Sequence, residues 1–314
     1  MTAKKIALLF SGQGAQTPGM GKDLSEHCES ARRLFQQGDE ILEYPLSRLA
    51  FEGPEEELTK TVNCQPALYV HGLACLAALR EEMGDFPIQA AAGLSLGEFT
   101  AHAAAGTFSF ETGLRLVAKR ARFMQEACEE TEGAMAAMIG ADESVVRDLA
   151  SETDVDIANL NSPGQVVISG ESSKVALAVS LASEHGIRRA MMLNVAGAYH
   201  SRLMQSAYLK LGEELELTPL DPPKTPVICN VDARPVKELR EIRDSLREQV
   251  TSTVRWVESL ECLLDQEHCD LFIELGPGGV LAGLLQRTRK GTAAVSIGDV
   301  PSLAAGVVKL KATA

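Results

Sequence analysis

The stretch QAAAGLSLGEF, residues 89–99, decides the fold, because small apolar residues lead directly into a Gly-x-Ser-x-Gly motif. Residues 89–93 predict a central strand, and residues 97–105 have the periodicity of a helix. A serine on such a strand-to-helix turn is typical of a nucleophile elbow, in which flanking glycines let the strand and helix approach closely. We therefore predict Ser95 as a nucleophile. The alternative is a glycine-rich turn that happens to contain a serine.

A second strand is expected at the N-terminus, where residues 6–10 form an unbroken apolar run. The turn that follows contains Gly12, Gln13 and Gly14, and in a parallel sheet it would lie beside the elbow. A backbone N–H of this turn and that of Leu96 could together stabilise an oxyanion. Such a turn could equally be structural, and Thr17 rules out a Gly-x-Gly-x-x-Gly dinucleotide motif.

The rest of the chain predicts an α/β fold with an insertion. Helices are expected at residues 66–82, with Pro66 at the start, and at 111–129, and a strand at 271–275. Between them the order is strand, helix, strand, strand, helix, strand, at 134–139, 142–150, 155–160, 166–169, 172–185 and 188–195, with Asp142 as a candidate helix cap. We predict a hydrolase-like parallel-sheet core, residues 1–130 and 198–314, with an inserted ferredoxin-like subdomain, residues 131–197.

A nucleophilic serine needs a base, and the chain has six histidines. His71 and His102 lie inside predicted helices and could simply be packed there. His200 follows the last strand of the predicted insertion and precedes a helix, at a junction where a loop can deliver a side chain into a cleft. The pattern alone favours His200 only slightly over His102.

The predicted helix at 111–129 contains the cations Lys119, Arg120 and Arg122. Such a cluster is usually a solvated helix face. If one of the arginines were buried near Ser95, it would form a fork for a substrate carboxylate or phosphate.

Composition narrows the class of protein. The chain has 314 residues, 30 basic and 43 acidic, and a net charge of −13, which argues against nonspecific binding to nucleic acid or anionic lipid. Its seven cysteines are widely spaced without a Cys-x-x-Cys pair, so we expect reduced thiols and no zinc. The N-terminal apolar run is too short for a signal peptide, and no apolar run is expected to span a membrane. We expect a cytoplasmic protein.

Taken together, the motifs resemble those of malonyl-CoA:acyl-carrier-protein transacylases of fatty-acid synthesis and the acyltransferase domains of polyketide synthases. They occur in family order over nearly the whole chain, and their joint occurrence is highly specific. The matching residues are GQGAQ at 12–16, GLSLGE at 93–98, Arg120 within KRARFMQ at 119–125, GAMAA at 133–137, NSPGQVVISG at 161–170, GAYH at 197–200 with Met204, Gln249, Trp256 and ELGPG at 274–278.

The resemblance implies a role for each matching position. Ser95 is similar to the acylated nucleophile and His200 to its base. The backbone N–H groups of Gln13 and Leu96 resemble the oxyanion hole, and Gln249 resembles the residue whose backbone carbonyl orients the histidine. The third member of the triad therefore need not be an acid.

For substrate binding, the resemblance implies that Arg120 clamps the free malonyl carboxylate and that Asn161 contacts substrate. Tyr199 stands where polyketide relatives with a bulky aromatic residue use malonyl groups, which favours malonyl here. One departure is Leu94, because most relatives have histidine before the serine, and a side contact to substrate would be lost.

The implied activity is transfer of malonyl from malonyl-CoA to the phosphopantetheine thiol of acyl carrier protein through a malonyl-serine. It would supply fatty-acid synthesis, with no cofactor or metal, no nucleic-acid or membrane partner, and a monomeric enzyme. A discrete acyltransferase loading a polyketide carrier is one alternative. The other is a serine esterase or thioesterase, which needs an acidic third residue after the serine. The acids in that interval include Asp142, Asp148, Asp154 and Asp156, all within the predicted insertion.

Because CoA and carrier proteins are anionic, an acidic enzyme must meet them through local cations. The candidates are Arg188 with Arg189, Lys119 with Arg122, and Arg287 with Arg289 and Lys290.

Overall fold

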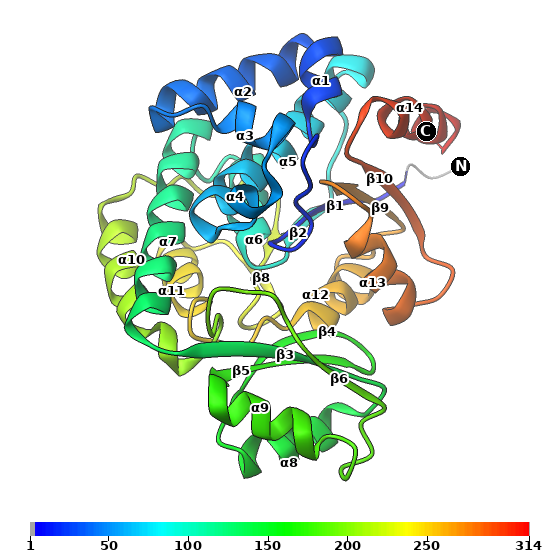
Figure 1. Cartoon of the computed structure of the whole chain (residues 1–314). Coiled ribbons are helices and arrows are strands. Elements are labelled where there is room, and N and C mark those ends of the chain that lie inside the picture. Colours follow the sequence, from blue (N-terminus) through cyan, green and yellow to red (C-terminus); the bar gives the residue numbers. More distant parts are fainter. Residues whose placement is uncertain (1–3, 314) are drawn as a thin grey trace.

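The larger of two β-sheets is built around β1 (Ile6–Phe10), as the apolar N-terminal run predicts. The computed structural model describes residues 4–313 (Figure 1). The sheet has the strand order β10 (Ala293–Ile297), β9 (Leu271–Leu275), β1, β2 (Ala90–Gly93), β7 (Val227–Ile228) and β8 (Pro235–Val236). Only β8 is antiparallel to its neighbour. Phe10 pairs with Gly93, so the turn after β1 and the serine motif lie at the same edge of the sheet.

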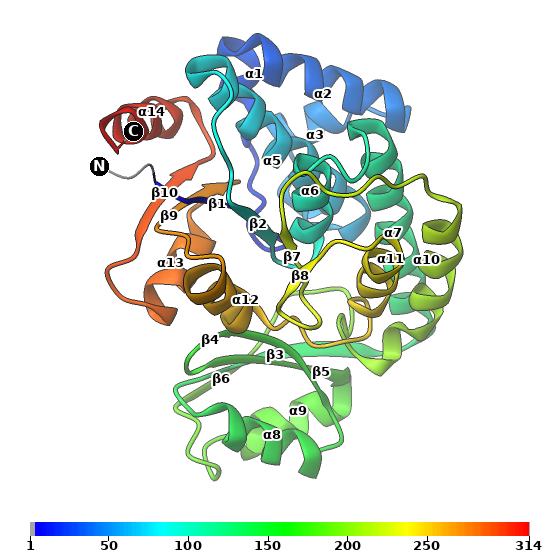
Figure 2. The same cartoon turned by 180° about the vertical axis from the view of Figure 1, so that it is seen from behind.

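Helices cover both faces of this sheet (Figures 1 and 2). Leu8 and Phe10 pack into one core with α5 (Thr61–Met83) and α7 (Phe110–Glu130), whereas Ala7 and Leu9 pack into another with α12 (Trp256–Glu261) and α13 (Val280–Thr288). The alternation explains why β1 is apolar throughout. The other helices around this sheet are α1 (Lys22–His27), α2 (Glu29–Leu42), α3 (Leu46–Glu52), α4 (Glu55–Thr59), α6 (Leu96–Ala104), α10 (Gln205–Leu217), α11 (Leu239–Glu248) and α14 (Val300–Thr313).

The prediction for α5 was wrong at its start. The helix begins at Thr61, and Pro66 lies inside it. Cys64 and Gln65 are almost completely buried, so core packing extends the helix ahead of a residue that local rules place in the first turn. Contrary to the sequence expectation, α5 is also long and apolar enough to cross a membrane, but 83% of the qualifying window is buried inside the protein. It is a core helix of the larger sheet.

The smaller sheet is antiparallel and has the order β4 (Asp156–Ser162), β5 (Gln165–Glu171), β3 (Gly133–Ile139) and β6 (Arg189–Met192). The helices α8 (Glu143–Glu152) and α9 (Ser172–Leu181) follow β3 and β5, so the predicted order of elements is confirmed. Three details differ from the prediction. The strand β6 covers only Arg189–Met192 of the expected residues 188–195. The helix α9 ends at Leu181, and Asp142 stands at the start of α8 without a capping hydrogen bond from its side chain.

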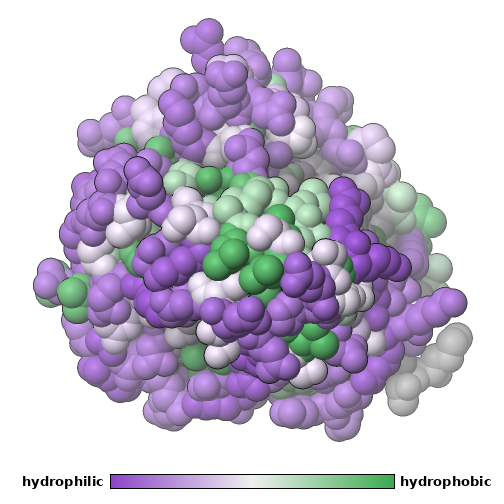
Figure 3. Space-filling view, turned by 60° about the horizontal axis from the view of Figure 1, so that its bottom comes forward, coloured by the Kyte–Doolittle hydropathy of each residue, from purple (hydrophilic) through white to green (hydrophobic). Residues whose placement is uncertain are grey.

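The two faces of the small sheet have different neighbours. Ala136 and Ile168 pack against α8 and α9, whereas Met135 and Val167 face the core of the larger sheet. Backbone hydrogen bonds join the sheet to the loop before α12, from Leu160 N–H to the Val254 carbonyl and from Val254 N–H to the Ala158 carbonyl. Hydrophilic residues dominate the face shown in Figure 3, with an apolar patch near its centre.

Candidate active site

Ser95 lies on a sharp turn between β2 and α6, with φ 54° and ψ −107°. A positive φ is uncommon for a residue with a side chain and is typical of strained functional turns. The glycines on either side are required by space. A Cβ on Gly97 would lie 2.1 Å from the Phe10 carbonyl oxygen, and one on Gly93 would lie 1.9 Å from the Gly97 backbone. The motif therefore has the geometry of a nucleophile elbow.

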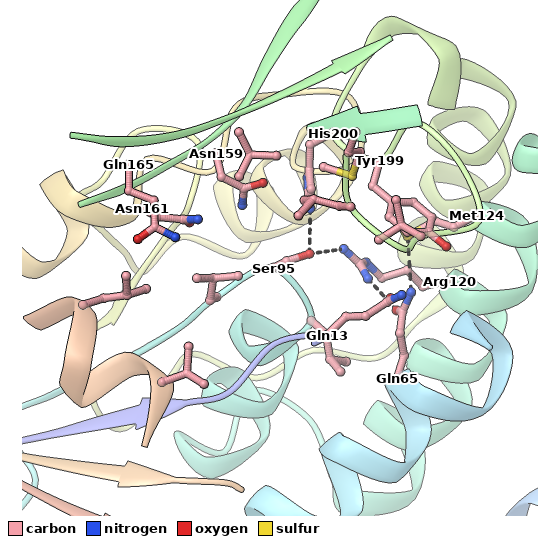
Figure 4. Close-up of a pocket in the computed structure, with 18 residues that line it drawn as sticks. Gln13, Gln65, Ser95, Arg120, Met124, Asn159, Asn161, Gln165, Tyr199 and His200 are labelled. Carbon is pink, nitrogen blue, oxygen red and sulfur yellow. Dashed lines mark hydrogen bonds between the residues drawn. The ribbon is translucent and has the colours of Figure 1, made fainter. Parts of the chain in front are cut away.

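His200 reaches Ser95 from the loop after β6. Its Nε2 lies 2.8 Å from Ser95 Oγ (Figure 4). Its Nδ1 lies 2.7 Å from the backbone carbonyl oxygen of Gln249. A carbonyl oxygen can only accept, so Nδ1 carries the proton and Nε2 accepts from the hydroxyl. The competing candidate, His102, is buried elsewhere and contacts Thr107 Oγ1 at 3.0 Å. The structure thus places His200 beside the serine and not His102, which the sequence pattern ranked only slightly lower.

Arg120 projects from α7 into the same site and is 1% exposed. Its Nη2 donates to Ser95 Oγ at 3.0 Å and to Gln249 Oε1 at 2.8 Å, and its Nη1 donates to Gln65 Oε1. Within residues 4–313, its Nε has no hydrogen-bond partner.

The other two cations of that cluster point elsewhere. Lys119 forms an ion pair with Glu214 at 2.5 Å, and Arg122 pairs with Glu126 at 3.5 Å. Only Arg120 combines burial with contact to the serine.

Burial sets the charge states at the site. Burial, together with the positive charge of Arg120, lowers the pKa of His200 to about 4. His200 is therefore neutral at pH 7 and able to accept the Ser95 proton. Burial also lowers the pKa of Arg120 to about 10, so the guanidinium stays charged. The site thus holds a neutral base beside a fixed positive charge.

A cavity of about 220 Å³ lies over Ser95, between the large and small sheets (Figure 4). All the predicted site residues except Gln249 line it: Gln13, Ser95, Leu96, Arg120, Asn161, Tyr199 and His200. Leu94, Leu193, Val195, Val280 and Leu284 contribute apolar side chains. Asn161 Oδ1 is buried and finds no hydrogen-bond partner among the described residues, so it is available to a ligand.

The backbone N–H groups of Gln13 and Leu96 have no partner in the part of the chain that the structure describes. Leu96 is the first residue of α6, where the helix dipole favours negative charge. Both residues line the cavity beside the serine, so the arrangement can accept a negatively charged oxygen.

Three contacting residues were missed by the sequence reasoning. Gln65 binds Arg120, Asn230 Oδ1 accepts from the Ser95 N–H at 2.7 Å, and Glu98 lies behind the elbow. Gln65 could have been noticed as a polar residue in an apolar helix. No local sequence pattern marked Asn230 as a site residue, because it lies on a loop far from Ser95 along the chain.

An acidic partner for His200 is absent among residues 4–313, because Nδ1 binds the Gln249 carbonyl. Asp154 and Asp156 instead pair with Arg202, at 2.8 and 2.9 Å. In the same range, no group of three His, Cys, Asp or Glu side chains is placed to hold a metal ion.

Comparison with known proteins agrees with this geometry. The sequence matches the family described as acyl transferase domain over residues 7–307. It is 43% identical over 314 residues to a malonyl CoA-acyl carrier protein transacylase of Bacillus subtilis, covering 98% of both chains.

Solved structures extend the match. An acyl-carrier-protein S-malonyltransferase from Bartonella henselae has a TM-score of 0.93 and 38% identity, covering 98% of this chain and 99% of the other. A malonyl-transacylase in complex with its type II polyketide acyl-carrier protein has a TM-score of 0.93 and 36% identity, covering 97% and 99%. With the nucleophile elbow, its histidine and the buried arginine in place, the chain belongs to the acyltransferase family that includes the malonyl-CoA:acyl-carrier-protein transacylases.

Proposed function

We propose that this acyltransferase moves a malonyl group from malonyl-CoA to the phosphopantetheine thiol of acyl carrier protein. The observation that carries the proposal is the position of Ser95 Oγ, which contacts both a neutral histidine and a buried guanidinium. The histidine can activate the serine as a nucleophile, and the guanidinium suits a substrate that ends in a carboxylate. Relatives named for this reaction at 37–43% identity support it.

In the proposed mechanism, His200 accepts the Ser95 proton as Oγ attacks the thioester carbonyl. The N–H groups of Gln13 and Leu96 stabilise the oxyanion, and the Gln249 carbonyl stabilises the imidazolium. The imidazolium then gives its proton to the departing CoA thiolate, which leaves malonyl-serine. The phosphopantetheine thiol reverses these steps, with its proton passing through His200 back to Ser95.

Arg120 is proposed to hold the malonyl carboxylate throughout, and Asn161 and Tyr199 to contact the substrate in the cavity. Support for Arg120 comes from its burial, because a buried guanidinium gains most from a charged partner. Leu94 contributes an apolar side chain to the cavity beside the serine.

For the architecture, we propose an acyltransferase core, residues 1–130 and 198–314, with residues 131–197 as a ferredoxin-like subdomain. The strand order β4-β5-β3-β6 with two crossing helices supports this. We further propose a cytoplasmic monomer that needs no cofactor or metal and binds neither nucleic acid nor membrane.

The docking surface for the carrier is proposed at Arg189 and Arg287. Both are exposed and, within the described residues, form no ion pair, whereas Lys119, Arg122 and Arg289 are paired with acids. Arg287 donates to Gln165, which lines the cavity, and Gln165 and Arg189 flank Ile139 across the small sheet. Two cations without an ion pair therefore lie on the side of the small sheet where Gln165 lines the cavity.

Fatty-acid and polyketide carriers present the same thiol, and relatives from both settings match the chain. A hydrolase is less well supported, because His200 lacks the acidic partner that this alternative requires.

The test is mass spectrometry of the purified chain with malonyl-CoA, then with phosphopantetheinylated carrier proteins of fatty-acid and polyketide type. We expect a malonyl adduct that Ser95→Ala abolishes and that passes to a carrier. Release of malonate to water without transfer would favour the hydrolase instead.

A further inference from the structure

Glu98 is a buried carboxylate that no step of the mechanism uses. It lies on α6 behind the elbow, is 0% exposed and does not line the cavity. Its oxygens accept hydrogen bonds from Gln249 Nε2 at 2.5 Å, from the Asn230 backbone N–H at 3.1 Å and from Ser245 Oγ at 3.4 Å. Burying a carboxylate costs free energy unless it is hydrogen-bonded. Any contribution of Glu98 must therefore act through these three hydrogen bonds.

The first bond fixes the orientation of the Gln249 amide. Arg120 can only donate hydrogen bonds, and it donates to Gln249 Oε1 at 2.8 Å. An ionised Glu98 can only accept, so Nε2 must face it. With the amide held this way, Nε2 also donates to the Ser95 carbonyl oxygen at 3.0 Å. The backbone of Gln249 meanwhile accepts from His200, so one residue contacts all three groups of the proposed mechanism.

The second bond fixes Asn230, which holds the other side of the elbow. Asn230 Oδ1 accepts from the Ser95 N–H at 2.7 Å, and Nδ2 donates to the Gly93 carbonyl oxygen at 2.8 Å. These backbone groups flank the strained Ser95 conformation. The amide side chains of Gln249 and Asn230 therefore form hydrogen bonds with the backbone of the elbow. Glu98 accepts a hydrogen bond from each of these two residues.

We propose that Glu98 is a positioning residue, which orients Gln249 and Asn230 and through them aligns Ser95, Arg120 and His200. The proposal rests on the function proposed above for those three residues. Glu98 acts through an acceptor oxygen, and a neutral side chain of the same shape retains that oxygen. Burial raises the pKa of Glu98 to about 7, and the protonated carboxyl also keeps one oxygen free to accept. The alignment of the elbow therefore depends on the hydrogen bonds that Glu98 accepts more than on its charge.

The test compares two near-isosteric variants, Glu98→Gln and Glu98→Met, in the full chain. The readout is the rate at which phenylmethylsulfonyl fluoride labels Ser95, which needs the serine and its base but no malonyl-CoA. We expect Glu98→Gln to label within about threefold of the wild type and Glu98→Met to label at least about tenfold more slowly, with thermal melting confirming that each is folded. Equal rates for both variants, fast or slow, would overturn the proposal.

A double-mutant cycle keeps the test decisive if Glu98→Met does not fold. Gln249→Glu removes the donor that faces Glu98 and the Ser95 carbonyl, so labelling should slow. Adding Glu98→Gln supplies an amide that can donate to the new carboxylate, and part of the rate should return. A double variant no faster than Gln249→Glu alone would contradict the orienting role. If the wild type labels normally but takes up no malonyl, the proposed function fails and the cycle still reports on Glu98.

Discussion

At the residue scale, the site depends on a single buried cation placed against a serine. Arg120 donates to Ser95 Oγ before any substrate is present, and its charge adds to the effect of burial, which lowers the pKa of His200 and keeps it neutral. The same group can therefore favour an ionised serine oxygen, hold a substrate carboxylate and tune the base.

Replacing Arg120 should separate malonyl from acetyl substrates. We expect Arg120→Ala to reduce the rate of acylation by malonyl-CoA about 100-fold, because charge-assisted hydrogen bonds to the carboxylate are lost. Acylation by acetyl-CoA, which has no carboxylate, should fall much less. Arg120→Lys keeps the charge without the planar fork and should be intermediate. Rapid-quench measurement of the acyl-enzyme checks this, and equal losses for both substrates would refute the clamp.

The pH dependence should follow from the lowered pKa of His200. A base must be unprotonated, and a pKa of about 4 instead of the usual 6.5 keeps His200 unprotonated well below neutrality. Labelling of Ser95 by phenylmethylsulfonyl fluoride should thus be nearly flat with pH from about 5.5 to 8. In Arg120→Ala the repulsion is gone, and the acid limb should move to higher pH. An acid limb of the wild-type pH profile centred near 6.5, the usual pKa of histidine, would contradict the lowered pKa of His200.

At the element scale, the nucleophile is positioned by the closeness of β1, β2 and α6. This closeness is possible because the two glycines of the motif leave no side chain between strand and helix. The strand and helix themselves follow from local pattern, but the contact between them depends on these two positions.

Adding one methyl group at this contact should be severe. A Cβ on Gly97 would meet the Phe10 carbonyl oxygen at 2.1 Å, so we expect Gly97→Ala to cost on the order of 3 kcal/mol in unfolding free energy and to abolish labelling of Ser95. The matched control is Gly283→Ala in α13, where nothing lies within 4 Å and the change should be neutral or stabilising. Urea unfolding of both variants measures this difference in stability, and similar midpoints would contradict the predicted cost of Gly97→Ala.

At the scale of the whole molecule, charge placement matters more than net charge. The chain carries −13 overall, yet Arg287 contacts Gln165 of the cavity lining, and Arg189 lies on the same small sheet. Neither has an acidic partner among residues 4–313. Local potential, not the total, steers an anionic carrier to its site.

Charge reversal should therefore act selectively. Arg189→Glu with Arg287→Glu should raise the KM for carrier protein by roughly tenfold at low salt, and the effect should shrink as salt screens it. The control is Arg289→Glu, because Arg289 already pairs with Asp265 at 2.6 Å and should contribute little to docking. Steady-state transfer assays at two ionic strengths decide, and equal KM values for both variants would place docking elsewhere.

The sequence predicted those features that have a local cause. The run at 6–10 and the strand at 271–275 were confirmed to the residue, because a strand buried on both faces is apolar throughout. The order of elements in the small sheet was also predicted. The short β8, the edge strand β10 and the terminal helix α14 were not, since weakly periodic segments take their structure from what they pack against.

For the site, the sequence by itself determined the elbow, because steric crowding makes its glycine spacing necessary. The residue pattern favoured His200 only slightly over His102 and did not say which of three neighbouring cations is buried, and only the family resemblance singled out His200 and Arg120. Those choices depend on where distant segments meet, and only the tertiary structure brings Gln249 and Asn230 to the serine. Hydrogen bonds between residues more than 100 positions apart leave no local pattern to read, so the alignment of the site was settled by the fold.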